Sequence, residues 1–131
     1  MKITASAVSL NVADPEASAA FLVDHFGFEQ AMAADGFASL TRADAGMSVV
    51  FLRTGLATLP ADQRDEHAAG LILAFEVDDL EGELARLEGE GVEITMPLTV
   101  EAWGERAFQV RDPNRVIVQL VDWKGPVGST G

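Results

Sequence analysis

Two stretches of alternating apolar and polar residues, each followed by a helical pattern, give the chain two similar halves. Apolar residues alternate with small or polar ones over residues 8–12, which predicts a strand with one buried face. Asp14 and Pro15 come next, as a helix cap and a residue suited to the first helical position. The helical pattern that follows stops at Gly27, a residue type that commonly ends helices.

The second half repeats this order. The alternation over residues 71–77 predicts a strand, Asp79 takes the capping role of Asp14, and Gly89 and Gly91 end the second helix. Short strands separated by turn residues follow each helix. They are expected near residues 28–33, 36–42 and 47–53 in the first half and near 92–95, 105–111 and 115–122 in the second.

Each half is therefore predicted to be a βαβββ module, which places the protein in the α+β class. We expect a single domain over residues 1–123, made of modules 1–54 and 70–123. A polar connector over residues 55–69 joins the modules, and residues 124–131 form a flexible tail.

Charge and composition exclude several classes of function. The 131 residues include nine basic and 21 acidic ones, giving a net charge of −12. Nucleic acids and anionic membranes both bind basic protein surfaces, so we expect neither to be a partner of this acidic chain. The absence of cysteine excludes disulfides, thiolate metal sites and cysteine nucleophiles. No apolar run reaches the roughly 20 residues of a membrane helix, and the N-terminus is unlike a signal peptide, which predicts a cytoplasmic protein.

The doubled module resembles the vicinal-oxygen-chelate superfamily, which includes glyoxalase I, extradiol dioxygenases and bleomycin-resistance proteins. The resemblance rests on LNVADPEASAAF, on FEVDDLEGELARL and above all on WGERAFQVRDPNRVIVQLV at 103–121. The last segment is similar to the family's WG-x-R-x-F-x-V-x-DP signature. The resemblance implies curled mixed sheets, with a helix on the convex face of each and a ligand site on the concave face.

Family enzymes hold a divalent metal with His or Glu side chains on the concave face. The resemblance places the corresponding positions at Ala7, Ile72 and Gln119. Two alkyl groups and a neutral amide cannot supply the converging nitrogen and carboxylate ligands that such a metal requires. His25 and His67 fall on the first helix and in the connector. We therefore expect no metal and no other cofactor.

Other catalytic arrangements have little support in the sequence. No serine lies in a nucleophile elbow, and no glycine loop suits a phosphate. Glu76 is expected on the concave face, as a general base or, more commonly, as a solvated or arginine-paired carboxylate. A binding protein is favoured. The alternatives are a lyase, isomerase or dioxygenase of this family, or a carrier of an aromatic metabolite.

The residues expected to bind the ligand combine aromatic, thioether and polar side chains, because aromatic faces stack on planar molecules and methionine adapts to irregular ones. Trp103 lies in a turn that borders the binding groove of the family, whereas the strand aromatics could equally pack in the core. The full set is Ser9, Phe37, Met47, Phe51, Arg53, Trp103, Phe108 and Gln119.

The bleomycin-resistance branch is the most similar in length, acidity and lack of metal ligands. The resemblance implies a homodimer with grooves between its subunits, which binds a drug without modifying it. The acidic charge favours a neutral or cationic ligand. We therefore expect a protein that sequesters a bulky aromatic natural product, such as a bleomycin-type glycopeptide or a planar polycyclic antibiotic.

Overall fold

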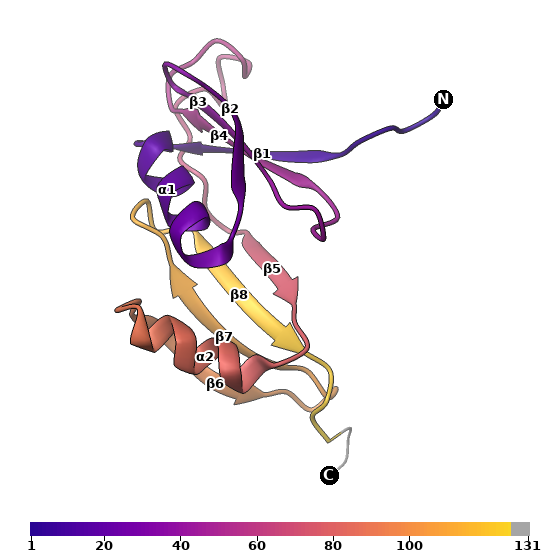
Figure 1. Ribbon diagram of the computed structural model, residues 1–131. Coiled ribbons are helices and arrows are strands. Elements are labelled where there is room, and N and C mark those ends of the chain that lie inside the picture. The colour runs from indigo at the N-terminus through magenta and orange to yellow at the C-terminus, as the bar shows by residue number, and fades with distance from the viewer. Residues whose placement is uncertain (127–131) are drawn as a thin grey trace. The chain divides into compact units, whose positions relative to one another are not determined.

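The computed structural model describes residues 1–126 and divides the chain into two compact units (Figure 1). The first unit is Met1–Gly70, and the second begins at Leu71. Each contains one helix and one four-stranded sheet, so the predicted α+β class with two βαβββ modules is confirmed. Most of the expected tail at 124–131 lies outside the described residues.

The first sheet has the strand order β1-β4-β3-β2. Strands β1 and β4 run parallel, and the other neighbours are antiparallel. Helix α1 packs on β2, β3 and β4. The elements are β1 (Ala7–Val12), α1 (Pro15–Phe26), β2 (Glu29–Ala34), β3 (Phe37–Thr41) and β4 (Ser48–Arg53).

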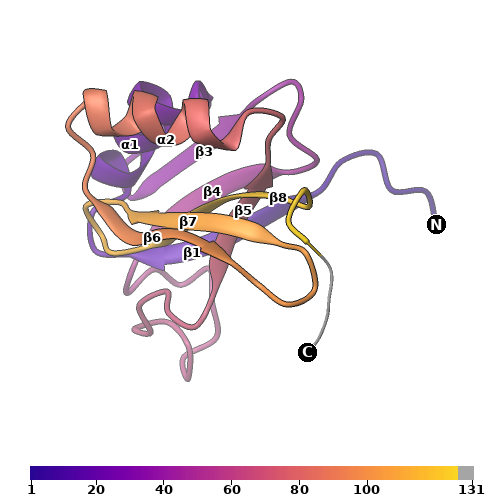
Figure 2. The ribbon, with the colours of Figure 1, turned by 90° about the horizontal axis from the view of Figure 1, so that it is seen from below.

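The second sheet repeats this arrangement in the order β5-β8-β7-β6, with β5 and β8 parallel. Figure 2 shows α2 on one face of this sheet, where it contacts β8. The elements are β5 (Ile72–Glu76), α2 (Leu80–Gly89), β6 (Ile94–Val100), β7 (Arg106–Arg111) and β8 (Ile117–Asp122).

The predicted helix starts are confirmed at the level of single hydrogen bonds. Asp14 Oδ1 accepts from the Ala17 amide over 3.2 Å, and Asp79 Oδ1 accepts from the Gly82 amide over 3.1 Å. Gly27 ends α1 in the left-handed conformation, with φ of 68°. Helix α2 ends at Gly89, and Gly91 follows its C-cap Glu90 with φ of 83°. Both helices therefore begin at the predicted aspartate caps and end at or beside the predicted glycines.

Two boundaries differ from the expectation. Strand β6 runs to Val100 rather than stopping near residue 95 and includes Pro97, because it is an edge strand where a missing N–H is tolerated. The connector belongs to the first unit, since the Ala68 amide donates to Asn11 O over 2.7 Å and the Gly55 amide donates to Arg64 O over 2.8 Å.

Alternate residues of each strand face opposite sides of the sheet, as predicted. One side packs under the helix and forms the core, with Leu10 and Val12 in the first unit and Val118 and Leu120 in the second. We call the opposite side of each sheet its helix-free face. It carries the other residues of the same strands and is the surface on which the ligand site is expected.

Candidate functional site

The helix-free face of the first sheet combines small hydroxyl side chains with apolar ones. Strand pairing aligns Ser9, Val50, Ser39 and Met32 in one row across the four strands. The adjacent row consists of Asn11, Leu52, Phe37 and Ala34. Paired residues of neighbouring strands project from the same face, so these side chains lie next to one another. These two rows contain apolar side chains, two hydroxyl groups and the Asn11 amide, but no charged group.

The helix-free face of the second sheet has a different polar centre. Its middle row consists of Ala74, Gln119, Gln109 and Met96. The row on one side contains Ile72, Ile117 and Arg111, and the row on the other contains Glu76, Val121, Ala107 and Thr99. The middle of this face is therefore neutral and polar, with apolar residues in both neighbouring rows.

A hydrogen bond joins the two glutamines of the middle row. Gln109 Nε2 donates to Gln119 Oε1 over 2.8 Å, and both residues are partly exposed. Gln119 is the last of the three positions at which the family resemblance places metal ligands. In this chain its amide oxygen accepts a hydrogen bond from a neighbouring side chain.

The other two metal-ligand positions carry side chains with no atom that could donate to a metal. Ala7 is exposed at the start of β1, and Ile72 is 48% exposed at the start of β5. Within residues 1–126 no three His, Asp or Glu side chains are grouped to hold a metal ion. His25 lies on α1 with its ring edge against Phe21, and His67 Nδ1 is 3.1 Å from Ala68 O.

Five of the eight expected ligand-binding residues are exposed or lie on a helix-free face. Ser9 and Phe37 are on the first face, and Gln119 is on the second. Met47, just before β4, is 50% exposed, and Trp103, in the loop between β6 and β7, is 59% exposed. Their role in binding stays a prediction.

The expectation that Phe51 and Phe108 line the ligand site is corrected by the structure. Both side chains are fully buried on the helix-covered faces. Phe51 pairs with Leu10, and Phe108 pairs with Leu120, and both partners belong to the core. Strand parity therefore assigns both rings to packing.

Arg53 also points to the helix-covered side, at the end of β4. Its guanidinium donates to Asp35 in the turn between β2 and β3, with Nη1 3.0 Å from Oδ1. The hydrogen bond from Arg53 lowers the pKa of the Asp35 carboxyl and raises the pKa of the guanidinium. This pairing assigns Arg53 a structural role at the turn.

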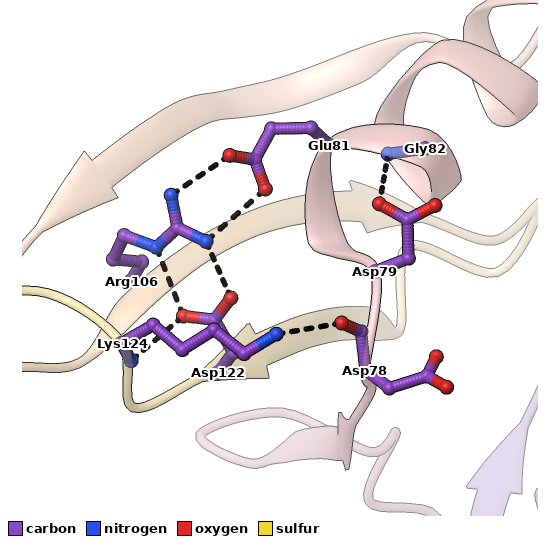
Figure 3. Close-up of polar contacts among 7 residues, drawn as sticks. All are labelled: Asp78, Asp79, Glu81, Gly82, Arg106, Asp122 and Lys124. Atoms are coloured by element: carbon purple, nitrogen blue, oxygen red, sulfur yellow. Dashed lines mark hydrogen bonds and ion pairs between the residues drawn. The ribbon is translucent and has the colours of Figure 1, made fainter.

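Arg106 forms a three-residue ion cluster at the start of α2 (Figure 3). Its Nε is 2.9 Å from Asp122 Oδ1, and its Nη1 is 3.0 Å from Glu81 Oε2. Asp122 is buried, and the hydrogen bonds from Arg106 lower the pKa of its carboxyl to about 2. The same contacts raise the pKa of Arg106 and lower that of Glu81. The cluster ties the helix to strands β7 and β8.

Lys124 extends this cluster to the segment after β8. Its amide donates to Asp122 Oδ1 over 3.1 Å, and its Nζ donates to Asp78 O over 2.8 Å. Figure 3 shows both contacts beside the Asp79 cap of α2. These contacts stabilise the end of the second module. Sequence reasoning did not identify the contacts to Asp78 and Glu81 because these residues are far along the chain from Lys124 and Arg106.

Gln109 is the site residue that sequence reasoning missed, although the signal was present. The turn Asp112-Pro113-Asn114 joins β7 and β8, and hairpin pairing around it places Gln109 opposite Gln119. Asp112 Oδ1 holds this turn by accepting from the amides of Asn114 and Val116, over 2.8 and 2.9 Å. A register count from the turn would have found the pair.

Neither helix in residues 1–126 has the length and apolar character needed to cross a membrane.

Solved structures with the same fold include a glyoxalase/bleomycin resistance protein/dioxygenase from Nocardioides. It is 20% identical in sequence, with a TM-score of 0.72, and the match covers 100% of this chain and 91% of that one. A lactoylglutathione lyase from Agrobacterium tumefaciens is 18% identical, with a TM-score of 0.73 over 94% of this chain and 96% of that one.

TioX from Micromonospora sp. ML1 is 25% identical, with a TM-score of 0.68 over 92% of this chain and 99% of that one. No curated protein matches the sequence significantly. A family model described as the glyoxalase/bleomycin resistance protein/dioxygenase superfamily matches residues 4–120. Both the doubled module and this match, over most of the chain, lead to one conclusion: the protein belongs to the glyoxalase/bleomycin resistance protein/dioxygenase superfamily.

Proposed function

We propose that the protein is a metal-independent binding protein that sequesters a bulky aromatic, neutral or cationic natural product. A bleomycin-type glycopeptide and a planar polycyclic antibiotic both fit this description. Binding alone would protect the cell, because a sequestered drug does not reach its target. The proposal includes a homodimer, which the family resemblance implies, and a cytoplasmic location, with the ligand bound against a helix-free face.

One observation carries this proposal. The three positions at which the family resemblance expects metal ligands are Ala7, Ile72 and Gln119, and Gln119 is hydrogen-bonded to Gln109. Methyl and alkyl groups have no lone pair to donate, and a neutral amide is a weak ligand for the divalent metals of this family. The same positions suit contact with an apolar ligand, because small and alkyl side chains leave room and supply dispersion contacts.

The charge of the chain supports the choice of ligand. A net charge of −12 attracts cations and repels anions at low ionic strength. Phosphorylated and other anionic compounds are therefore poor candidates. Trp103 and Phe37 are available for stacking on a planar ring system, since the first is 59% exposed and the second is partly exposed.

Tryptophan fluorescence tests the proposal directly. The protein is titrated with metal-free bleomycin and with ethidium, a planar cation, and the expected result is saturable binding of at least one compound below 1 µM, on the order of −8 kcal/mol or stronger. Trp103→Phe should weaken binding, while Trp123→Phe, a change of the other exposed tryptophan, should not. Absence of sub-micromolar binding to both compounds would contradict the proposal.

An enzymatic function is the second candidate, because the family spans glyoxalases and dioxygenases as well as resistance proteins. Glu76 favours it, since this carboxylate is exposed on the helix-free face of β5. A general base must reach the substrate proton, and an exposed carboxylate at the edge of a site can do so. Recovery of a chemically altered ligand, abolished by Glu76→Gln, would support this function over sequestration.

A further inference from the structure

The Gln109–Gln119 pair has unused hydrogen-bonding capacity on the helix-free face of the second sheet. A primary amide has two N–H donors and one carbonyl acceptor. The contact between the two residues uses one N–H of Gln109 and the carbonyl of Gln119. In the described part of the chain, no other hydrogen bond reaches either side-chain amide. The amide nitrogen of Gln119 and the amide oxygen of Gln109 therefore remain available to a ligand.

This combination does not depend on which way the amides are turned. Rotating both amides by 180° reverses the hydrogen bond, so that Gln119 donates and Gln109 accepts. One free nitrogen and one free oxygen still remain, now on the opposite residues. The pair therefore presents an adjacent donor and acceptor in either arrangement.

The fold itself does not require this pair. The same positions of the first sheet hold Ser39 and Val50, which are paired across β3 and β4 as Gln109 and Gln119 are across β7 and β8. No side-chain hydrogen bond joins Ser39 and Val50, because valine has neither donor nor acceptor. The first unit folds with the same strand order without an amide pair at this place. A role other than holding the sheet together is therefore indicated for the glutamines.

The surroundings of the pair favour a flat and largely apolar ligand. Ala74 flanks Gln119 on β5, and Met96 flanks Gln109 on β6. Ile72 and Ile117 occupy the next row, which continues to Arg111 on β7, and Ile72 is 48% exposed. A ring system lying on these alkyl and thioether groups would bring its polar edge to the two amides.

We propose that the Gln109–Gln119 pair binds the planar amide edge of the ligand, as found in a lactam, an imide or a carboxamide. Such an edge has a C=O acceptor and an N–H donor side by side, which match the free nitrogen and the free oxygen of the pair. A carboxylate would use only the donor, and a cation only the acceptor. This inference rests on the proposed binding function and specifies the ligand group that the second sheet recognises.

A matched pair of small probes tests this inference. 2-Quinolone has a lactam edge, and N-methyl-2-quinolone has the same rings without the N–H donor. Both are titrated into 15N-labelled protein, and the side-chain NH2 signals of the glutamines are followed by NMR. The expected result is a shift of the Gln109 and Gln119 signals and an affinity for 2-quinolone about tenfold higher, as for loss of one well-formed hydrogen bond.

Variants that copy the first unit provide the control. Gln119→Val and Gln109→Ser install the residues found at the equivalent positions of the first sheet, and each should abolish the preference for the N–H form. Gln30→Val makes the same chemical change on β2 of the first unit and should retain the preference. Circular dichroism spectra of the variants check that each remains folded.

Three results would overturn the inference. They are equal affinity for the two probes, a preference that persists in either variant, and no binding of either probe at millimolar concentration. The proposed function fails by a different result, namely the absence of sub-micromolar binding to bleomycin and ethidium. Retained drug binding without a lactam preference would therefore overturn the amide-edge inference alone.

Discussion

The two modules place opposite charges at the same point of the fold. Phe51 on β4 and Leu120 on β8 are core residues at equivalent positions, beside β1 and β5. Each strand ends two residues later, at Arg53 in the first module and at Asp122 in the second. Arg53 pairs with Asp35, whereas Asp122 pairs with Arg106 and through it with Glu81. The repeat therefore preserves an ion pair at this point while exchanging the sign of the strand residue.

Burial distinguishes the two pairs. The side chains of Arg53 and Asp35 are 41% and 91% exposed, whereas those of Arg106 and Asp122 are 18% and 3% exposed. Water screens the first pair, and such surface pairs contribute little to stability. A buried carboxylate without its cation is strongly destabilising, so we expect the second pair to contribute more to stability than the first. The comparison leads us to expect that an ion pair at the same position contributes little to stability in one module and much more in the other.

The helix-free faces differ in a similar way. Met32 lies in the row of Ser9 on the first face, and Met96 lies at the equivalent place in the middle row of the second face. Each methionine follows a register shift in its edge strand. Between the methionine and the parallel strand, the first face has Ser39 and Val50 and the second has Gln109 and Gln119. The shared core pattern determines the fold of both modules, and the helix-free faces are where the chain has diversified.

The largest effect is expected from breaking the buried pair. Asp122→Asn should lower the free energy of unfolding by about 3 kcal/mol, because it removes the charge that faces Arg106 in a buried setting. Asp35→Asn, the matched change in the first module, should leave the unfolding midpoint nearly unchanged. Urea denaturation of both variants measures the difference. Equal effects of the two substitutions would contradict the distinction between the modules.

Acid should remove most of the stability that the Asp122 carboxylate contributes to the fold. Its folded-state pKa is about 2, below the usual 3.8, so the carboxylate stabilises the fold fully above pH 4. That contribution is lost as pH falls from about 4 through about 2. The unfolding midpoints of the wild type and Asp122→Asn, measured from pH 6 down to pH 2, should therefore converge. A constant gap across this range would be inconsistent with the assigned pKa.

A moderate effect is expected where the first helix ends. Gly27→Ala should cost about 2 kcal/mol, because alanine disfavours a φ of 68° and its Cβ would lie 2.8 Å from Arg42 Nη1. Gly91→Ala, after the second helix, should cost about 1 kcal/mol, since its φ is 83° but the space around it is open. The melting temperatures of the two variants measure the difference. A larger loss at Gly91 would show that the Arg42 contact does not matter.

The smallest effect is expected at the β7–β8 turn. Arg115 has a φ of 65° and is the non-glycine residue in the left-handed region among residues 1–126. Arg115→Gly should raise the free energy of unfolding by up to about 1 kcal/mol, because the relief of strain exceeds the added entropy of the unfolded chain. Differential scanning calorimetry can resolve this change. A lower melting temperature would indicate that the arginine side chain makes a stabilising contact.

The periodicity of the sequence was sufficient to predict both modules, their helix caps and the parity of most strand residues. Asp14, Asp79 and Gly27 act locally, so a short window of sequence reveals them. The faces of Phe51 and Phe108 were predicted incorrectly because an aromatic residue in a strand suits either a core or a ligand site. The strand register decides between them, and in both cases it aligns the ring with a core leucine.

Long-range partners were less predictable. Glu81 lies on α2, and nothing in its local sequence indicates that it meets Arg106. The Gln109–Gln119 and Arg106–Asp122 contacts, by contrast, follow from counting outward from the hairpin turn, because both are pairs of the β7–β8 register. Contacts within a hairpin can therefore be predicted from sequence, whereas contacts between a helix and distant strands require the structure.

Native mass spectrometry tests the central claim most directly. In separate samples, the protein is incubated with Zn²⁺ alone and with the tighter-binding of metal-free bleomycin and ethidium, and the mass of each intact species is measured. We expect a protein dimer carrying the drug at its original mass in the drug sample, and no zinc on the protein in the other sample. Stoichiometric zinc on the protein, or a drug of altered mass, would contradict the claim.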